Sequence, residues 1–459
     1  MNETPHGWHR TTLATVAQLK TGPFGSALHK SDYVGDGTPL INPSHIKHGK
    51  LQPDSAVSID VRALERLSEY RLQAGDVVMG RRGEMGRCAV VPSPAAGWVC
   101  GTGSVIVRPT PAILPNFLQR LLSSPGAVQR LNGESVGSTM VNLNQGVLLG
   151  LPVALPPLLE QQRIADKLDA VVARVDACRD RLARVAPLLK RFRKSVLFAA
   201  TSGVLTSDWR VQHCSGQESE TAAAELPSGW RSTMFAEVCR EITVGFVGRM
   251  ATEYVDSGVP FLRSMNVREF RFDPKGLKFI SPAFHRSIQK SALRPGDLAI
   301  VRSGAPGICC VVPPELADAN CSDLVIARPG ADLLSGYGCV LINSAFGASH
   351  VAATQVGVAQ AHFNVGAMKL MPCPLPPMAE QAEIVRRVEV LFAFADRLEA
   401  RLAKAQAAAD RLTPALLAKA FRGELVSQDP ADEPAAELLK RLTAGRPAPA
   451  AKVRRPRAA

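Results

Sequence analysis

The chain has 459 residues, more than one compact core normally organises and enough for roughly two to four domains. Lysine and arginine number 54 against 41 aspartate and glutamate residues, and this formal charge of +13 favours a polyanionic partner such as nucleic acid. A hydrophobic content of 46% excludes a wholly disordered chain. Because no apolar stretch suits a membrane span or a signal core, we expect a cytoplasmic protein with no membrane partner.

An internal duplication organises the chain. The segment LPPLLEQQRIADKLD, which begins at Leu155, returns as LPPMAEQAEIVRRVE at Leu375, 220 residues later. Upstream of these copies, LQAGDVVMGRRGEMGRCAVVP from Leu72 aligns with LRPGDLAIVRSGAPGICCVVP from Leu293. Repetition at a fixed offset indicates two copies of one structural unit. We therefore predict an α+β protein in which a strand-rich segment and a helical segment each occur twice.

The composition places six segments along the chain. Glycine and proline punctuate the two strand-rich segments, whereas the helical segments run for long stretches without either. In order, the segments are a first globular domain at 1–155, a helical spacer at 156–206, a linker at 207–228, a second globular domain at 229–374, a second helical spacer at 375–425, and a C-terminal tail at 426–459 that we expect to be partly disordered.

Each helical spacer carries apolar residues at alternating steps of three and four, the pattern of a coiled-coil seam. Seams of matched length and phase favour pairing of the two helices as an antiparallel coiled coil over the alternative of two unrelated core helices. Proline removes a backbone donor and crowds the preceding turn, so Pro187 predicts a kink or short break and Pro414 a new helix start. The seam residues expected to mediate pairing or partner docking are Ile164, Leu168, Val175, Leu182 and Leu189 in the first helix, and Ile384, Val388, Leu398, Leu402 and Leu412 in the second.

Motifs for catalysis are missing from the sequence. It contains no GxxxxGK[ST] phosphate loop and no pair of motifs typical of a methyl-donor site. The ten cysteines form no CxxC pair, so we expect free thiols and assign no metal. The sequence therefore predicts a binding protein without cofactors. The alternatives are a diverged DNA methyltransferase or nuclease and a coiled-coil scaffold that joins two protein-binding domains.

Several motifs together point to a known family. The twice-used LPPxxEQ start of a long helix, the helix ends SVLFAATSGVL and ALLAKAFRGEL, the LPSGW before the second half and the tail DPADEPAAELLKRL resemble those of specificity subunits of type I restriction-modification systems. The resemblance covers essentially the whole chain and is strongest in the helical segments.

The resemblance implies a non-catalytic DNA-recognition subunit with an asymmetric, bipartite double-stranded target. Each globular domain would then be a target recognition domain for one half-site. Two modification subunits carrying S-adenosylmethionine would dock on the helices, and restriction subunits that use ATP and magnesium would join where they exist.

Candidate DNA contacts follow from side chains suited to base edges in loop-like contexts, since arginine favours guanine and asparagine or glutamine favours adenine. Arg81 recurs as Arg302 and Asn144 as Asn364, which indicates a structural turn or a phosphate contact as readily as a base contact. The candidates are Lys20, Asn42, His45, Lys47, Arg81, Arg82, Asn142 and Asn144 in the first domain, and Arg249, Arg263, Asn266, Arg268, Arg302, Gln360, His362 and Asn364 in the second.

Overall fold

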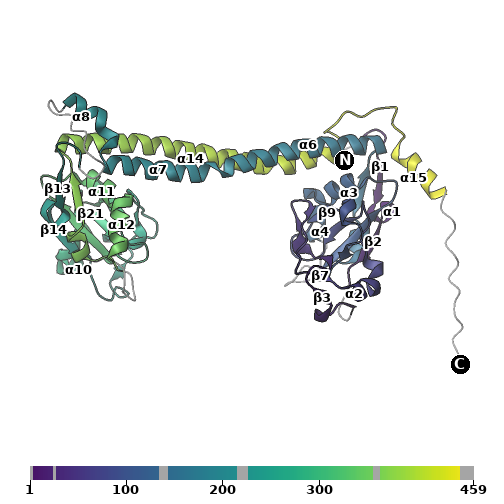
Figure 1. The fold of residues 1–459 in the computed structure, drawn as a ribbon, viewed down its shortest axis with the longest axis horizontal. Coiled ribbons are helices and arrows are strands. Elements are labelled where there is room, and N and C mark those ends of the chain that lie inside the picture. Colours follow the sequence, from purple (N-terminus) through teal and green to yellow (C-terminus); the bar gives the residue numbers. More distant parts are fainter. Residues whose placement is uncertain (1–3, 24–26, 134–142, 214–225, 355–361, 445–459) are drawn as a thin grey trace. The chain divides into compact units, whose positions relative to one another are not determined.

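The computed structural model describes residues 4–23, 27–133, 143–213, 226–354 and 362–444 (Figure 1). The chain divides into two compact units, one formed by Met1–Arg181 with Ala405–Ala459 and the other by Leu182–Lys404. Both divisions fall within the helical spacers. Each unit therefore contains one strand-rich domain and a part of both spacers.

Two four-stranded sheets form the strand-rich domain of the first unit. One is antiparallel, with strand order β2-β11-β8-β9, and the other has the order β10-β4-β7-β3 with a parallel β10–β4 pair. The pairing of β1 with β12 joins the two ends of the domain, and β5 and β6 form a hairpin. The strands are β1 (His9–Thr12), β2 (Ala17–Thr21), β3 (Tyr33–Val34), β4 (Thr38–Ile41), β5 (Ile46–Lys47), β6 (Lys50–Leu51), β7 (Ser58–Ile59), β8 (Val77–Gly80), β9 (Cys88–Val90), β10 (Val99–Cys100), β11 (Ser104–Pro109) and β12 (Pro152–Leu155).

Short helices cover this domain, and the first helical spacer completes its core. Phe117 and Leu118 of α3 belong to the same buried cluster as Ile164 and Leu168 of α6. Proline at the start of α3 suits a helix N-terminus, where its missing N–H has no intrahelical partner. The helices are α1 (Leu13–Val16), α2 (Val61–Arg66), α3 (Pro115–Leu122), α4 (Pro125–Gly133), α5 (Gln145–Leu149), α6 (Leu158–Ala183) and α15 (Ala435–Ala444).

The second unit repeats this topology with one further strand, β20, in its second sheet. Its antiparallel sheet has the order β14-β24-β21-β22, its second sheet the order β15-β19-β16-β23-β20, and β13 pairs with β25 as β1 does with β12. The strands are β13 (Arg231–Met234), β14 (Cys239–Val244), β15 (Tyr254–Val255), β16 (Val259–Leu262), β17 (Val267–Arg268), β18 (Arg271–Phe272), β19 (Lys278–Ile280), β20 (Ala292–Leu293), β21 (Leu298–Val301), β22 (Cys309–Val311), β23 (Ala319–Cys321), β24 (Leu324–Pro329) and β25 (Pro372–Leu375). The helices are α7 (Val185–Thr201), α8 (Ser207–His213), α9 (Phe235–Val238), α10 (Pro282–Ser287), α11 (Ser335–Asn343), α12 (Ala345–Ala353), α13 (Val365–Lys369) and α14 (Met378–Ala420).

The helical spacers pair antiparallel within each unit. In the first unit, the Arg179 guanidinium of α6 donates to the Ala409 carbonyl of α14 at 3.0 Å. In the second unit, Arg193 of α7 forms ion pairs with Asp396 and Glu399 of α14 at 2.5 and 3.2 Å. In the second unit, Thr206, which follows α7, bonds to Glu380 near the start of α14, so residues later than Arg193 meet residues earlier than Asp396. In the first unit, Ile164 and Leu168 share a buried cluster with Leu417 and Ala420, so residues earlier than Arg179 meet residues later than Ala409. This confirms the predicted antiparallel coiled coil.

The two prolines have different outcomes. The break predicted near Pro187 is confirmed, because α6 ends at Ala183 and α7 begins at Val185. The new helix start predicted near Pro414 is wrong, because α14 continues through this proline. A proline in a helix interior costs one backbone hydrogen bond and crowds one turn. The contact of Arg179 one turn before Pro414 and the burial of Leu417 one turn after it hold the helix on both sides.

The predicted seam is buried or half-buried except at one position. Leu412 is 48% exposed, so its assignment to the seam is wrong. After the buried Ala409, the next residues of the seam in α14 are Thr413, which is half-buried, and Leu417, which is buried. The step after Ala409 is therefore four residues, to Thr413, where the heptad pattern predicts three, to Leu412. A straight helix drifts from a strict heptad in this way. Ile164, Leu168, Val175, Leu189, Ile384, Val388 and Leu402 are buried, and Leu182 and Leu398 are half-buried.

Candidate nucleic-acid interface

Four loops meet at one edge of the antiparallel sheet in the first unit, where β2 and β8 end and β11 begins. Backbone N–H groups join them: Arg81 donates to Gly103 at 2.8 Å, Leu143 to Arg81 at 3.0 Å, and Gly101 to Ile41 at 2.9 Å. We call this surface the first loop edge and define it by Thr21, Asn42, Arg81, Arg82, Gly101–Gly103 and Leu143–Gln145.

The second unit has a matching surface. Arg302 donates its backbone N–H to Asp323 at 3.3 Å, Phe363 to Arg302 at 3.0 Å, and Ser322 to Leu262 at 3.0 Å. The same backbone framework therefore recurs with different side chains. We call it the second loop edge and define it by Gly245, Arg263, Ser264, Arg302, Ser303, Ser322, Asp323 and His362–Asn364.

The recurring arginines hold loops in place. Arg81 is only 8% exposed, and its Nε donates to the Leu143 carbonyl at 3.0 Å. Burial lowers the pKa of Arg81, and repulsion by the neighbouring Arg82 lowers it further. Arg302 is half-buried and accepts through its carbonyl the bond from Phe363. The recurrence of Arg81 and Arg302 thus has a structural cause in the backbone of the loop edge.

The recurring asparagines are helix N-caps. The Asn144 side chain accepts the Val147 N–H at 2.8 Å at the start of α5, and Asn364 accepts the Ala367 N–H at 2.9 Å at the start of α13. A side-chain oxygen at this position satisfies a donor that the helix leaves without a partner. Of the three explanations for their recurrence, a structural turn, a phosphate contact and a base contact, the caps support the structural turn.

Besides Arg81, the candidates Asn266 and His45 are buried, and burial argues against their prediction as DNA contacts. Asn266 accepts the Arg263 N–H at 3.1 Å and donates to the Asp273 carbonyl at 3.0 Å. His45 is buried with its Nδ1 3.0 Å from the Leu40 carbonyl. Both side chains belong to short helical turns and do not reach the surface.

The other candidates differ in their surroundings. Lys20 pairs with Glu69, and Arg268 lies 3.3 Å from Asp273. The Arg263 guanidinium donates to the Gly276 carbonyl at 2.7 Å, and the Asn42 Oδ1 is buried without a hydrogen-bond partner among the described residues. Lys47, Arg82, Arg249 and His362 are exposed, and Asn142 and Gln360 lie outside the described residues.

Sequence reasoning missed Ser264, Ser303 and Asp323 at the second loop edge, although it included His362. Ser303 donates to the Asp323 carboxylate at 2.9 Å, and the Ser264 hydroxyl lies 3.2 Å from its other oxygen. His362 Nδ1 lies 2.8 Å from the Ser303 hydroxyl. The available signal was the duplication, which aligns Asp323 with Gly103 and Ser303 with Arg82.

The repeated Glu-Gln pair explains how each domain is fixed to its helix. In the first unit, Trp8 donates its indole N–H to the buried Glu160 at 3.0 Å. Gln161 donates to the Ala112 carbonyl at 3.0 Å and accepts the Leu114 N–H at 2.9 Å, so it closes a loop of the domain. Burial raises the pKa of Glu160, while the Trp8 bond and the charge of Arg163 act in the opposite direction.

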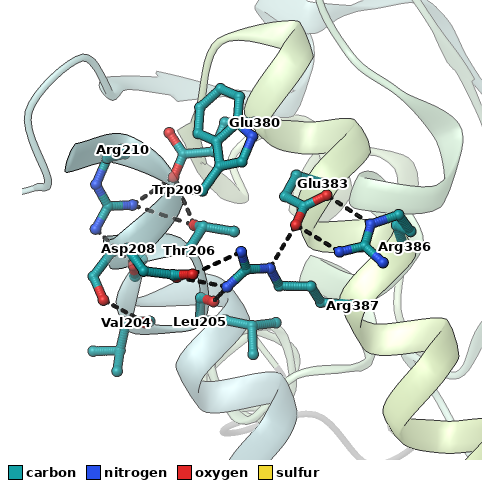
Figure 2. A network of polar contacts seen from close by, with 12 residues as sticks. Val204, Leu205, Thr206, Asp208, Trp209, Arg210, Glu380, Glu383, Arg386 and Arg387 are labelled. Carbon is teal, nitrogen blue, oxygen red and sulfur yellow. Dashed lines mark hydrogen bonds and ion pairs between the residues drawn. The ribbon is translucent and has the colours of Figure 1, made fainter. Parts of the chain in front are cut away.

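The second unit repeats this arrangement and adds an ion-pair network, which Figure 2 shows between the α8 region and the first turns of α14. Trp230 donates to Glu380 at 3.0 Å, and Arg210 forms an ion pair with the same carboxylate. Arg387 bridges Asp208 and Glu383, both at 2.6 Å.

The arginines of this network lower the pKa values of the carboxylates that they contact. Hydrogen bonds from Arg386 and then Arg387 lower the pKa of Glu383 to about 2, and the bond from Arg387 also lowers the pKa of Asp208. Ionised carboxylates are thus favoured where α8 contacts α14. We call Asp208, Glu383, Arg386 and Arg387 the α8 clamp.

Large apolar side chains remain exposed on the helical spacers. In α14, Val390 is 55% and Phe394 47% exposed, one helical turn apart and therefore on one face. Phe198 of α7 is also exposed. Exposed apolar side chains gathered on one face are typical of surfaces that bind proteins.

Two negative findings apply to the described residues alone. No three His, Cys, Asp or Glu side chains there gather as a metal ion would require. No described helix is long and apolar enough to cross a membrane.

Comparison with known proteins places the chain among relatives of one kind. Residues 5–185 match the type I restriction modification DNA specificity domain. The chain is 29% identical to the type I restriction enzyme EcoKI specificity subunit of Escherichia coli K12, over 97% of this chain and 96% of the relative. It is 30% identical to the EcoDI specificity subunit of Escherichia coli, over 73% of this chain and 78% of the relative.

A solved structure shares the fold. The HsdS subunit from Thermoanaerobacter tengcongensis is similar with a TM-score of 0.60 and 22% identity, over 92% of this chain and 99% of that one. A second, from a study of complex assembly and conformational transition in a type I restriction-modification system, gives a TM-score of 0.65 at 20% identity, over 93% of this chain and all of the other. These likenesses support the duplicated α+β architecture.

Proposed function

Because this chain belongs to the specificity subunits of type I restriction-modification systems, we propose that it recognises an asymmetric, bipartite DNA target with one strand-rich domain per half-site. One observation carries the proposal: two domains of the same topology present the same backbone framework at their loop edges with different side chains. A common scaffold that carries different loop side chains in its two copies can recognise two different short DNA sequences.

The contrast between the loop edges is chemical. The first presents the exposed guanidinium of Arg82, where the second presents the Ser303 hydroxyl and the Asp323 carboxylate. Guanidinium groups favour guanine, and carboxylates favour the amino group of cytosine. Identical half-sites would not call for this difference, so the target is asymmetric.

The helical spacers supply the surface for partner subunits. The exposed Val390 and Phe394 of α14 and the exposed Phe198 of α7 are the side chains that a protein partner would cover. Two modification subunits dock there and bring S-adenosylmethionine. Restriction subunits, with ATP and magnesium, join where the system includes them.

In this assembly the chain itself is non-catalytic and binds no cofactor. The modification subunit moves the methyl group to an adenine in each half-site, and this chain selects the adenine. Extrusion of a base from the duplex costs a few kcal/mol, which a pocket in the modification subunit offsets.

Methyl transfer by the purified components tests the proposal. The chain alone and the chain with its modification subunit are incubated with S-adenosylmethionine carrying a labelled methyl group and with genomic DNA. We expect transfer only when both are present, confined to adenines in one bipartite motif. Transfer by the chain alone would assign it the chemistry, and sequence-independent transfer by the complex would refute recognition by this chain.

A further inference from the structure

Asp323 places a carboxylate at the second loop edge, a surface that the proposed function assigns to polyanionic DNA. Its φ of 56° lies in the left-handed region, which a non-glycine residue seldom adopts. The matching position of the first domain is Gly103, with a φ of 84°. Both residues accept, through their backbone carbonyls, the N–H of the arginine that directly follows the neighbouring strand. The fold therefore requires this turn, but it does not require a carboxylate there.

Two hydroxyl groups fix the orientation of this carboxylate. Ser303 donates to Oδ1 at 2.9 Å, and the Ser264 hydroxyl lies 3.2 Å from Oδ2 and 3.1 Å from the Asp323 carbonyl. The first domain has Arg82 and Pro43 in their places, so the carboxylate and its two hydroxyl partners are found in the second domain together. Replacement of all three at once indicates one functional group.

A further contact strengthens the arrangement. The Ser303 hydroxyl has one proton, which Asp323 accepts, so the contact of 2.8 Å between Ser303 and His362 Nδ1 requires the ring nitrogen to donate. Donors thus converge on Asp323 from two directions. An ionised carboxylate offers about four acceptor positions. Ser303 occupies one, and the single Ser264 proton, which the Asp323 carbonyl also attracts, occupies at most one more. Because Asp323 is only half-buried, acceptor capacity remains accessible.

We propose that Asp323 is a specificity-determining residue of the second domain and accepts a hydrogen bond from the exocyclic amino group of a cytosine in the second half-site. This inference rests on the proposed function. Phosphates repel a carboxylate, so an acidic side chain at a DNA surface is favourable where it meets an amino donor, and the N4 group of cytosine is the donor that acidic side chains recognise. Ser264 and Ser303 are positioning residues that hold the carboxylate.

The Asp323→Gly variant tests the proposal with the backbone preserved, since glycine accommodates the left-handed turn as Gly103 does. The complex with the modification subunit is expressed in a strain that lacks other adenine methylation, and methylated adenines are mapped across the genome. We expect one cytosine of the second half-site to become degenerate, with selectivity there reduced about tenfold or more. The first half-site stays unchanged.

The Asp323→Asn variant is the matched control. An amide offers one donor and one acceptor, the pattern that fits adenine, so we expect preference at the same base to move from cytosine towards adenine. Ser303→Ala should relax the same position to a smaller extent.

Unchanged motifs in both Asp323 variants would overturn the proposal and leave Asp323 as a structural connection between loops. If Asp323→Gly failed to fold, the Asn variant would decide alone. A wild-type map that is not bipartite would instead refute the proposed function, so the two failures are distinguishable.

Discussion

Two glutamates in matching positions, Glu160 and Glu380, accept the same tryptophan bond but have different neighbours. Glu160 is buried, and burial raises its pKa, whereas Glu380 also forms an ion pair with Arg210 and accepts the Thr206 hydroxyl at 2.7 Å. The negative charge of Glu160 is thus disfavoured by burial, whereas that of Glu380 is balanced by the Arg210 guanidinium.

Replacing each glutamate with glutamine separates these roles. Glu160→Gln keeps an acceptor for Trp8 and removes a buried charge, so we expect unchanged or slightly increased stability. Glu380→Gln leaves the Arg210 guanidinium without its carboxylate partner and should destabilise by about 3 kcal/mol. Denaturant unfolding at pH 7 measures both, and equal losses would contradict this assignment.

Arg82 is the exposed guanidinium of the first loop edge. Arg82→Ala should weaken recognition of the first half-site by roughly 1–3 kcal/mol if it contacts a base, and leave the second half-site unchanged. The exposed Arg62 of α2, outside the loop edge, provides the control variant. Methylation mapping reports both half-sites, and an altered second half-site would contradict the division between domains.

At the scale of elements, the sequence predicts the periodic pattern of a helix better than the residues at which the helix begins and ends. The antiparallel seam and the break near Pro187 follow from patterns of apolar residues and from proline chemistry. The uninterrupted α14 does not, because contacts from residues far away in sequence, such as Arg179, offset the effect of Pro414. Likewise, the sequence shows that Asn144 and Asn364 recur, but only the structure identifies them as helix N-caps.

The α8 clamp predicts an acid-sensitive contact. Glu383 has a folded pKa of about 2, below its ordinary value of 4.5, so its ionised form stabilises the native state above that ordinary value. This stabilisation is lost as the pH falls from about 4.5 towards 2. The unfolding free energy of wild type should therefore exceed that of Glu383→Gln at pH 6 and approach it near pH 3. A constant difference across this range would contradict the ion-pair explanation.

The helix pairing predicts that the spacers set the gap between half-sites. Because Arg179 lies opposite Ala409, one heptad inserted after Asp180 and another after Ala408 lengthens both helices at the same level and preserves the seam. We expect methylation mapping to show a longer gap with unchanged half-sites. Insertion into one helix alone is the control and should impair assembly, whereas an unchanged gap in the double insertion would contradict the prediction.

At the scale of the whole molecule, duplication provides two strand-rich domains of similar topology, to which the proposed function assigns independent recognition of one half-site each. The matching pairs His9–Leu155 and Arg231–Leu375 mark where each domain joins the helical spacers. The sequence predicts the duplication, the α+β class and the family, since these depend on repeated patterns. It does not predict which polar residues lie at the loop edges, because His45 and Asn266 are turned inward by hydrogen bonds within their own short helical turns and adjoining loops, which residue type alone does not reveal.

Replacing 231–375 with a second copy of 9–155 tests the independence of the domains. Because both segments end in the same strand pairing, we expect the chimaera to fold and to direct methylation to a motif that contains the first half-site twice. A motif that retains the original second half-site would show that recognition lies outside the exchanged domain.

The central claim is that one chain recognises two different half-sites through its two loop edges. A methylation map of the host genome, with and without this chain, tests it most directly. The account predicts one gapped, asymmetric motif with a methylated adenine in each half-site, lost entirely when the chain is absent. A continuous or perfectly palindromic motif that depends on this chain would contradict it.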